Sequence, residues 1–117
     1  MDFKTACQLI AEQTLPKYET HDTFLARLRQ GQPPVPGQVT SLLLALQAVY
    51  DALQSASTLD RELAQALFLI AYESRNLFES ARAAGVAWPP LLDEDLTRIA
   101  IATYKIFAHE PGEPTNS

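Results

Sequence analysis

The longest helical pattern in this chain runs over residues 58–84, TLDRELAQALFLIAYESRNLFESARAA, and it indicates the fold class. Apolar residues recur there every three or four positions, as they do on the buried face of a helix. We expect one helix over about this whole stretch, capped by Ser57 or Thr58 and ended by Gly85. The core stripe that the spacing predicts is Leu59, Leu63, Leu67, Ile70, Leu77 and Ala81.

Helical spacing also covers the chain on both sides of this stretch, and signals for strands are nearly absent. The other expected helices are about 2–13 (capped by Asp2, with Phe3, Cys7 and Ile10 buried), a short one capped by Asp22, about 39–56, and about 94–109 (capped by Asp93, with Phe107 among its buried residues). We therefore expect an all-α, single-domain antiparallel bundle of four to five helices over residues 1–109, with the long helix at its centre. Residues 110–117 have no apolar content and are expected to be disordered.

Charge and cysteine content narrow the possible partners and compartment. The chain has 117 residues, nine Lys and Arg against fourteen Asp and Glu, and a net charge of −5. Nucleic-acid phosphates and acidic membrane surfaces bind clustered basic side chains, so neither is an expected partner. Cys7 is the single cysteine, which excludes an intrachain disulfide, and no apolar secretory signal opens the sequence. We therefore expect a cytoplasmic protein without a membrane span.

Sequence signatures of enzymes and cofactor sites are absent. The chain contains no phosphate-binding loop, no nucleophile elbow and no Glu-x-x-His metal motif, so we expect no cofactor and no metal. His21 and Asp22 form the one imidazole–carboxylate pair of this kind near a helix start, and a capping role for Asp22 explains them. Glu73 is the leading candidate for a perturbed carboxylate, if Tyr50, Tyr104 or an arginine draws it inward. The alternative is a solvated Glu73 on the helix flank.

A proline-rich connector, residues 31–37, separates the second and third expected helices. Its Pro-Pro-Val-Pro core, residues 33–36, is similar to a polyproline ligand. The competing interpretation is a rigid loop that sets the geometry of the two helices.

A second row of side chains lies opposite the core stripe of the long helix, and it has the composition of a protein interface. Aromatic side chains with arginine and glutamate around them are typical of interface centres and rims. The row consists of Arg61, Gln65, Phe68, Tyr72, Arg75, Glu79 and Arg82, and the last helix adds Ile101, Tyr104 and Ala108. Three explanations remain open: coverage by the N-terminal helices, self-association through Phe68 and Tyr72, or another protein partner.

Three function classes follow from these observations. The first is a non-enzymatic interaction or assembly module, adaptor-like or a homodimer, which uses the second row. The second is a carrier or sensor with a small-molecule pocket lined by aromatic side chains, namely Tyr50, Tyr72, Trp88 and Tyr104. An enzyme that uses His21, Asp22 or Glu73 is a distant third, because catalysis needs several converging groups.

Overall fold

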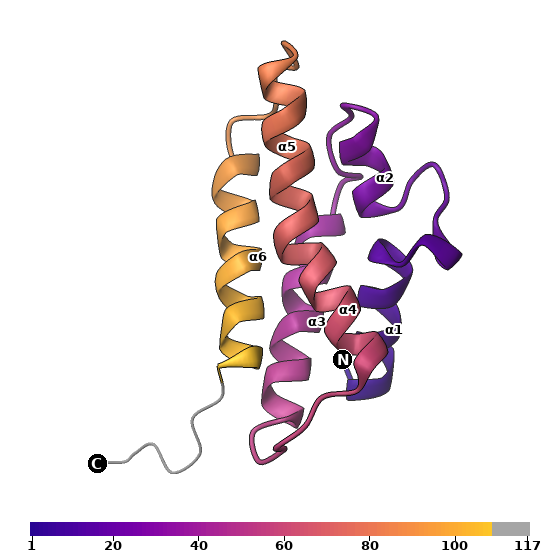
Figure 1. Ribbon diagram of the computed structural model, residues 1–117, viewed down its shortest axis with the longest axis vertical. Coiled ribbons are helices and arrows are strands. Elements are labelled where there is room, and N and C mark those ends of the chain that lie inside the picture. The colour runs from indigo at the N-terminus through magenta and orange to yellow at the C-terminus, as the bar shows by residue number, and fades with distance from the viewer. Residues whose placement is uncertain (109–117) are drawn as a thin grey trace, which may run out of the picture.

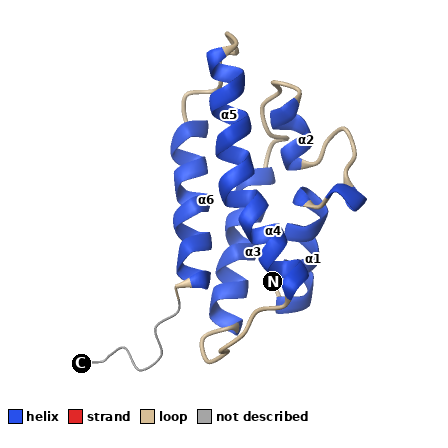
Figure 2. Cartoon of the chain, viewed as in Figure 1, coloured by secondary structure: helices blue, strands red, loops and turns tan. Residues whose placement is uncertain are grey.

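The computed structural model describes residues 1–108, and all regular structure in that part of the chain is helical (Figure 2). His109, expected to end the last helix, and the tail expected over residues 110–117 lie outside the described residues. The elements are α1 (Phe3–Thr14), the 3₁₀ turn η1 (Pro16–Tyr18), α2 (Phe24–Arg29), α3 (Gln38–Ala52), α4 (Arg61–Phe68), the π-helical segment η2 (Leu69–Glu73), α5 (Ser74–Ala83) and α6 (Leu92–Phe107). The all-α bundle is confirmed.

The segments α4, η2 and α5 form one continuous rod, residues 61–83, which spans the length of the bundle (Figure 1). Its main neighbours are α6 along η2, α1 at its beginning and α2 at its end. On the other side of the core, α3 packs between α1 and α6. The rod is antiparallel to α6, and α1 is antiparallel to α3, whereas α3 and α6 run in the same direction (Figure 1).

The rod begins and packs differently from the predicted helix. Asp60, not Ser57 or Thr58, is its N-cap, because the Asp60 carboxylate accepts a hydrogen bond of 3.1 Å from the backbone N–H of Leu63. A π turn holds more residues than an α turn, so η2 rotates every later residue relative to a pattern of 3.6 residues per turn. The core after η2 therefore contains Ser74 and Phe78, while the predicted core residues Leu77 and Ala81 are only half-buried.

Several predicted helix ends are also corrected. The third helix stops at Ala52 rather than Ala56, and Phe107 is half exposed rather than buried. Asp22 does not cap α2, whose N-cap is Thr23. Asp93 does not cap α6, which begins one residue earlier, at Leu92. Both carboxylates form ion pairs instead, Asp22 with Arg27 and Asp93 with Arg75.

For the first helix, α1, the predicted N-cap Asp2 is confirmed, but the predicted set of buried residues is partly wrong. Asp2 accepts a hydrogen bond of 2.7 Å from the backbone N–H of Thr5, which lowers the pKa of the Asp2 carboxyl. Ala6, Ile10 and Thr14 are its buried residues, whereas Phe3 is exposed.

The connector between α2 and α3 is tied to α1 by a pair of glutamine side chains. Gln38, in the first turn of α3, donates to the side-chain oxygen of Gln13 at 2.8 Å and to the carbonyl of Asp22 at 2.9 Å. The same Gln13 oxygen accepts from the backbone N–H of Phe24 at 2.7 Å. Arg27 donates to the carbonyl of Pro33 at 2.9 Å. These bonds support the interpretation of the proline-rich segment as a loop that sets helix geometry.

Candidate interaction surface

Two aromatic rings project from the outer face of the rod. Phe68 and Tyr72 are one turn apart, and their rings stack with centroids 5.1 Å apart and an interplanar angle of 19°. They are 55% and 57% exposed, whereas Ile70 between them is fully buried. The apolar middle of the rod therefore sends Leu67 and Ile70 into the core and leaves the two rings in contact with each other and with solvent.

The α6 helix carries two more large exposed apolar side chains at about the level of these rings. Arg75 of the rod donates to the hydroxyl of Thr97 on α6 at 3.0 Å, which fixes the register of the two helices. Phe68 lies seven residues before Arg75, and Tyr104 lies seven residues after Thr97. Because the two helices are antiparallel (Figure 1) and Arg75 contacts Asp93 and Thr97, Phe68 and Tyr104 fall within about one turn of the same level.

Ile101 lies on α6 between Thr97 and Tyr104, and it is 51% exposed, while Tyr104 is 67% exposed. We call the four side chains Phe68, Tyr72, Ile101 and Tyr104 the aromatic face. All four side chains are exposed, and they lie on two neighbouring helices at levels within about two turns of one another.

The N-terminal helices do not cover the aromatic face. The ion pair between Lys17, which follows α1, and Glu62 at 2.6 Å holds that part of the chain on a different side of the rod. Glu62 and Phe68 are six residues apart. At 100° per residue, their side chains point in directions about 120° apart around the helix axis. The explanation in which the N-terminal helices hide the two rings is therefore wrong.

At one end of the aromatic face, ion pairs and hydrogen bonds connect the rod to α6. Arg75 donates to the Asp93 carboxylate at 2.7 Å, and Glu79 accepts from Arg82 at 2.6 Å and from Arg75 at 3.4 Å. Arg75 and Glu79 were expected as interface residues, and the structure gives them this intrachain role as well. The guanidinium groups of Arg75 and Arg82 lie over the ring of Phe78, 5.1 and 4.8 Å from its centroid.

The two remaining residues of the predicted row, Arg61 and Gln65, continue it toward the beginning of the rod. Both are exposed. Among residues 1–108, the Arg61 guanidinium forms no ion pair. Sequence reasoning missed Lys105, which is exposed on α6 and also has no ion pair in the described part of the chain. Its position four residues after Ile101 was the available signal, since residues four apart share one helix face.

Residues with possible acid–base or metal chemistry do not converge. Glu73 lies in η2, half-buried, and its carboxylate has no hydrogen bond within residues 1–108 to Tyr50, Tyr104 or an arginine. Over the same residues, no group of three or more His, Cys, Asp or Glu side chains could hold a metal ion. Burial raises the pKa of the Cys7 thiol, and the negative charge of Asp60 adds to the rise.

The aromatic residues that were expected to line a ligand pocket also lie apart. Trp88 stacks on Phe78 with ring centroids 5.6 Å apart, and its indole N–H donates to the Phe78 carbonyl at 3.0 Å. Tyr50 packs against the core from α3, while Tyr72 and Tyr104 face solvent. The sequence-based pocket of these four side chains is therefore not formed.

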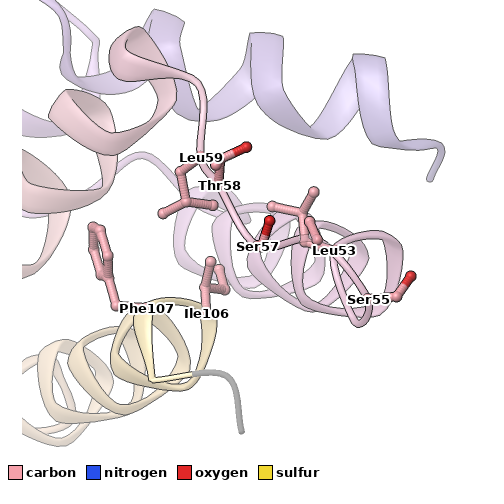
Figure 3. Close-up of a pocket in the computed structure, with 8 residues that line it drawn as sticks. Leu53, Ser55, Ser57, Thr58, Leu59, Ile106 and Phe107 are labelled. Carbon is pink, nitrogen blue, oxygen red and sulfur yellow. The ribbon is translucent and has the colours of Figure 1, made fainter. Parts of the chain in front are cut away.

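A hollow of about 630 Å³ is present elsewhere, where α3 and α6 end together. Figure 3 shows Ile106 and Phe107 reaching from α6 toward Leu59, with Leu53 at the end of α3. Ser55, Ser57 and Thr58 of the connecting loop add hydroxyl groups to its wall.

The described helices include none that is both long and apolar enough to cross a bilayer. Comparison with protein-family models, curated proteins and solved structures finds no match to this chain.

Proposed function

We propose that this protein is a non-enzymatic assembly module that self-associates through the aromatic face. The observation that supports this proposal is the stacked pair Phe68–Tyr72, which is more than half exposed, with Ile101 and Tyr104 also exposed on the neighbouring helix α6. Exposed aromatic clusters with charged residues around them have the composition of interface centres. The largest apolar patch on a small folded domain is often a functional surface.

The energetics favour a weak and reversible dimer. Burying the exposed part of one large apolar side chain contributes about 1–1.5 kcal/mol, so the eight side chains of a symmetric pair contribute about 10 kcal/mol. Association itself costs at least about 4 kcal/mol. The net free energy of association is then about −6 kcal/mol, which corresponds to a Kd on the order of 10–100 μM.

The substitution Phe68→Glu tests this proposal directly. It places a charge at the centre of the surface on both copies, and we expect dimerisation to weaken at least about 100-fold. Since Phe68 is exposed, we expect the free energy of unfolding to change by less than about 1 kcal/mol. The measurement is the solution molar mass over a concentration series, by light scattering or sedimentation.

A matched control is Leu44→Glu on α3, which replaces another exposed apolar side chain with the same charge. Leu44 lies on the helix that faces the rod across the core, so it projects from another side of the bundle. The proposal requires Leu44→Glu to dimerise like the wild type. Equal weakening by both variants would show that added charge, and not the aromatic face, controls association.

A second candidate function is the binding of a small apolar molecule in the hollow between the ends of α3 and α6. Its volume is within the range of about 300–1,000 Å³ that is usual for ligand sites, and apolar side chains with a few hydroxyls are typical linings. Leu59→Trp would fill the hollow. We expect native mass spectrometry to show a bound small molecule on the wild type and none on this variant; a wild type that carries no ligand after purification from cells contradicts this function.

A further inference from the structure

The aromatic face has charges of opposite sign at its two ends. At the end where the rod begins lie Arg61 and Lys105, both exposed, and we call this the basic end. Arg61 is in the first turn of α4, where the positive end of the helix dipole disfavours a cation. It therefore gains from a carboxylate supplied by another molecule, because no intrachain ion pair within residues 1–108 neutralises it.

At the other end, carboxylates outnumber the basic side chains that contact them. Glu79 and Glu94 point outward there, with side chains 47% and 67% exposed, and we call this the acidic end. The full set of ion-paired groups at this end is Glu79, Asp93, Glu94 and Asp95 against Arg75, Arg82 and Arg98. One negative charge is left uncompensated.

The two ends are symmetric about one level of the bundle. On the rod, the midpoint between Arg61 and Glu79 falls at about residue 70, between the two stacked rings. On α6, the midpoint between Glu94 and Lys105 falls at about residue 100. The bonds of Arg75 to Asp93 and Thr97 place residue 75 opposite about residue 95, and so residue 70 opposite about residue 100. Both helices thus give the same centre.

We infer that two copies of this chain pair through the aromatic face as an antiparallel dimer, with a two-fold axis perpendicular to the helices at the level of Ile70. This inference rests on the proposed self-association. The axis brings Phe68 of one copy beside Tyr72 of the other, and it places each basic end against the partner's acidic end. A parallel dimer would place like charges together at both ends, which is unfavourable.

The size of the surface agrees with a pair of this kind. Arg61 and Glu79 are separated by about 27 Å along the rod, and two adjacent helices are about 20 Å wide. The surface is thus about 500 Å² on each copy, near the lower limit for specific interfaces. Charge complementarity then sets the orientation of a pair that apolar contact alone would hold loosely.

Distances between paired spin labels test the orientation. In a Cys7→Ala background, Gln65→Cys and Ser80→Cys place single labels at exposed positions on either side of the centre without altering a charge. In the antiparallel dimer, the distance between the two labels at one position grows with the distance of that position from residue 70. Along the rod, it is about 15 Å for labels at residue 65 and about 30 Å for labels at residue 80. A parallel dimer gives similar short distances at both sites, and that result overturns the inference.

Charge reversal gives a second test that does not depend on labels. Arg61→Glu with Lys105→Glu makes both ends acidic, and we expect dimerisation at low salt to weaken about tenfold. Adding Glu79→Lys and Glu94→Lys exchanges the signs of the two ends, and we expect this to restore the wild-type Kd. Thermal unfolding of each variant shows that it is folded.

The possible outcomes separate the two proposals. A wild type that stays monomeric overturns both of them. A dimer that is disrupted by Phe68→Glu but indifferent to the charge reversals retains the self-association and overturns the antiparallel arrangement.

Discussion

Side chains that are close in sequence on the rod differ in burial: some pack in the core, and others are exposed to solvent. Ile70 is fully buried, while Phe68 and Tyr72 on either side of it are exposed and stacked on each other. The outward direction of the two rings could be predicted from the sequence, because they lie on the face opposite Leu63 and Leu67. Their mutual stacking depends on side-chain rotamers, which helical spacing does not specify.

Cys7 is the residue with the plainest chemical prediction. Its half-buried position raises the pKa of the thiol, mainly by desolvation, so less of the reactive thiolate is present at neutral pH. We expect slow alkylation of the folded protein at pH 7.5 and a rate that continues to rise above pH 9. The rate is followed by mass spectrometry, with protein unfolded in guanidinium chloride as the control. Equal rates in the folded and unfolded states would contradict the assignment.

At the scale of elements, the π-helical segment η2 explains the main error of the sequence-based core. Leu63, Leu67 and Ile70, before and within it, are buried as predicted. After η2, the buried position moves from Leu77 to Phe78. A pattern of 3.6 residues per turn contains no sign of an extra residue. The π segment packs against α6, and the Ser74 hydroxyl donates to the Ile70 carbonyl, but neither contact can be recognised from helical spacing alone.

The shifted register gives a direct stability prediction. Phe78→Ala removes a fully packed ring with Trp88 stacked on it, and we expect a loss of about 3–5 kcal/mol in the free energy of unfolding. Leu77→Ala removes a half-buried side chain, so its cost is expected to be roughly half as large. Chemical denaturation measures both. A greater loss for Leu77→Ala would contradict the register that η2 imposes.

Helix ends were predicted less well than helix positions, for a related reason. Ser57, Thr58, Asp60, Asp22 and Asp93 are all suitable cap residues, and sequence gives no strong ground for choosing among neighbours. Tertiary contacts make the choice: Asp93 is drawn to Arg75, while Asp60 remains free to cap α4.

For the whole molecule, the helical bundle could be predicted from apolar spacing and proline-rich connections, and it is confirmed. The arrangement of its helices could not, because it depends on contacts between distant segments. The antiparallel contact of the rod with α6 brings Ile101 and Tyr104 to about the level of Phe68, and this places two separate sequence patterns on the same part of the bundle. The charged side chains of the two helices can be assigned to a basic end and an acidic end only once the register of the helices is known.

The molar mass of the wild-type protein over a wide concentration range is the most direct test of self-association through the aromatic face. Sedimentation equilibrium from about 1 to 500 μM is expected to show a reversible rise from 12.9 kDa toward twice that mass, with a midpoint on the order of 10–100 μM. A mass that stays at 12.9 kDa throughout this range would contradict the account.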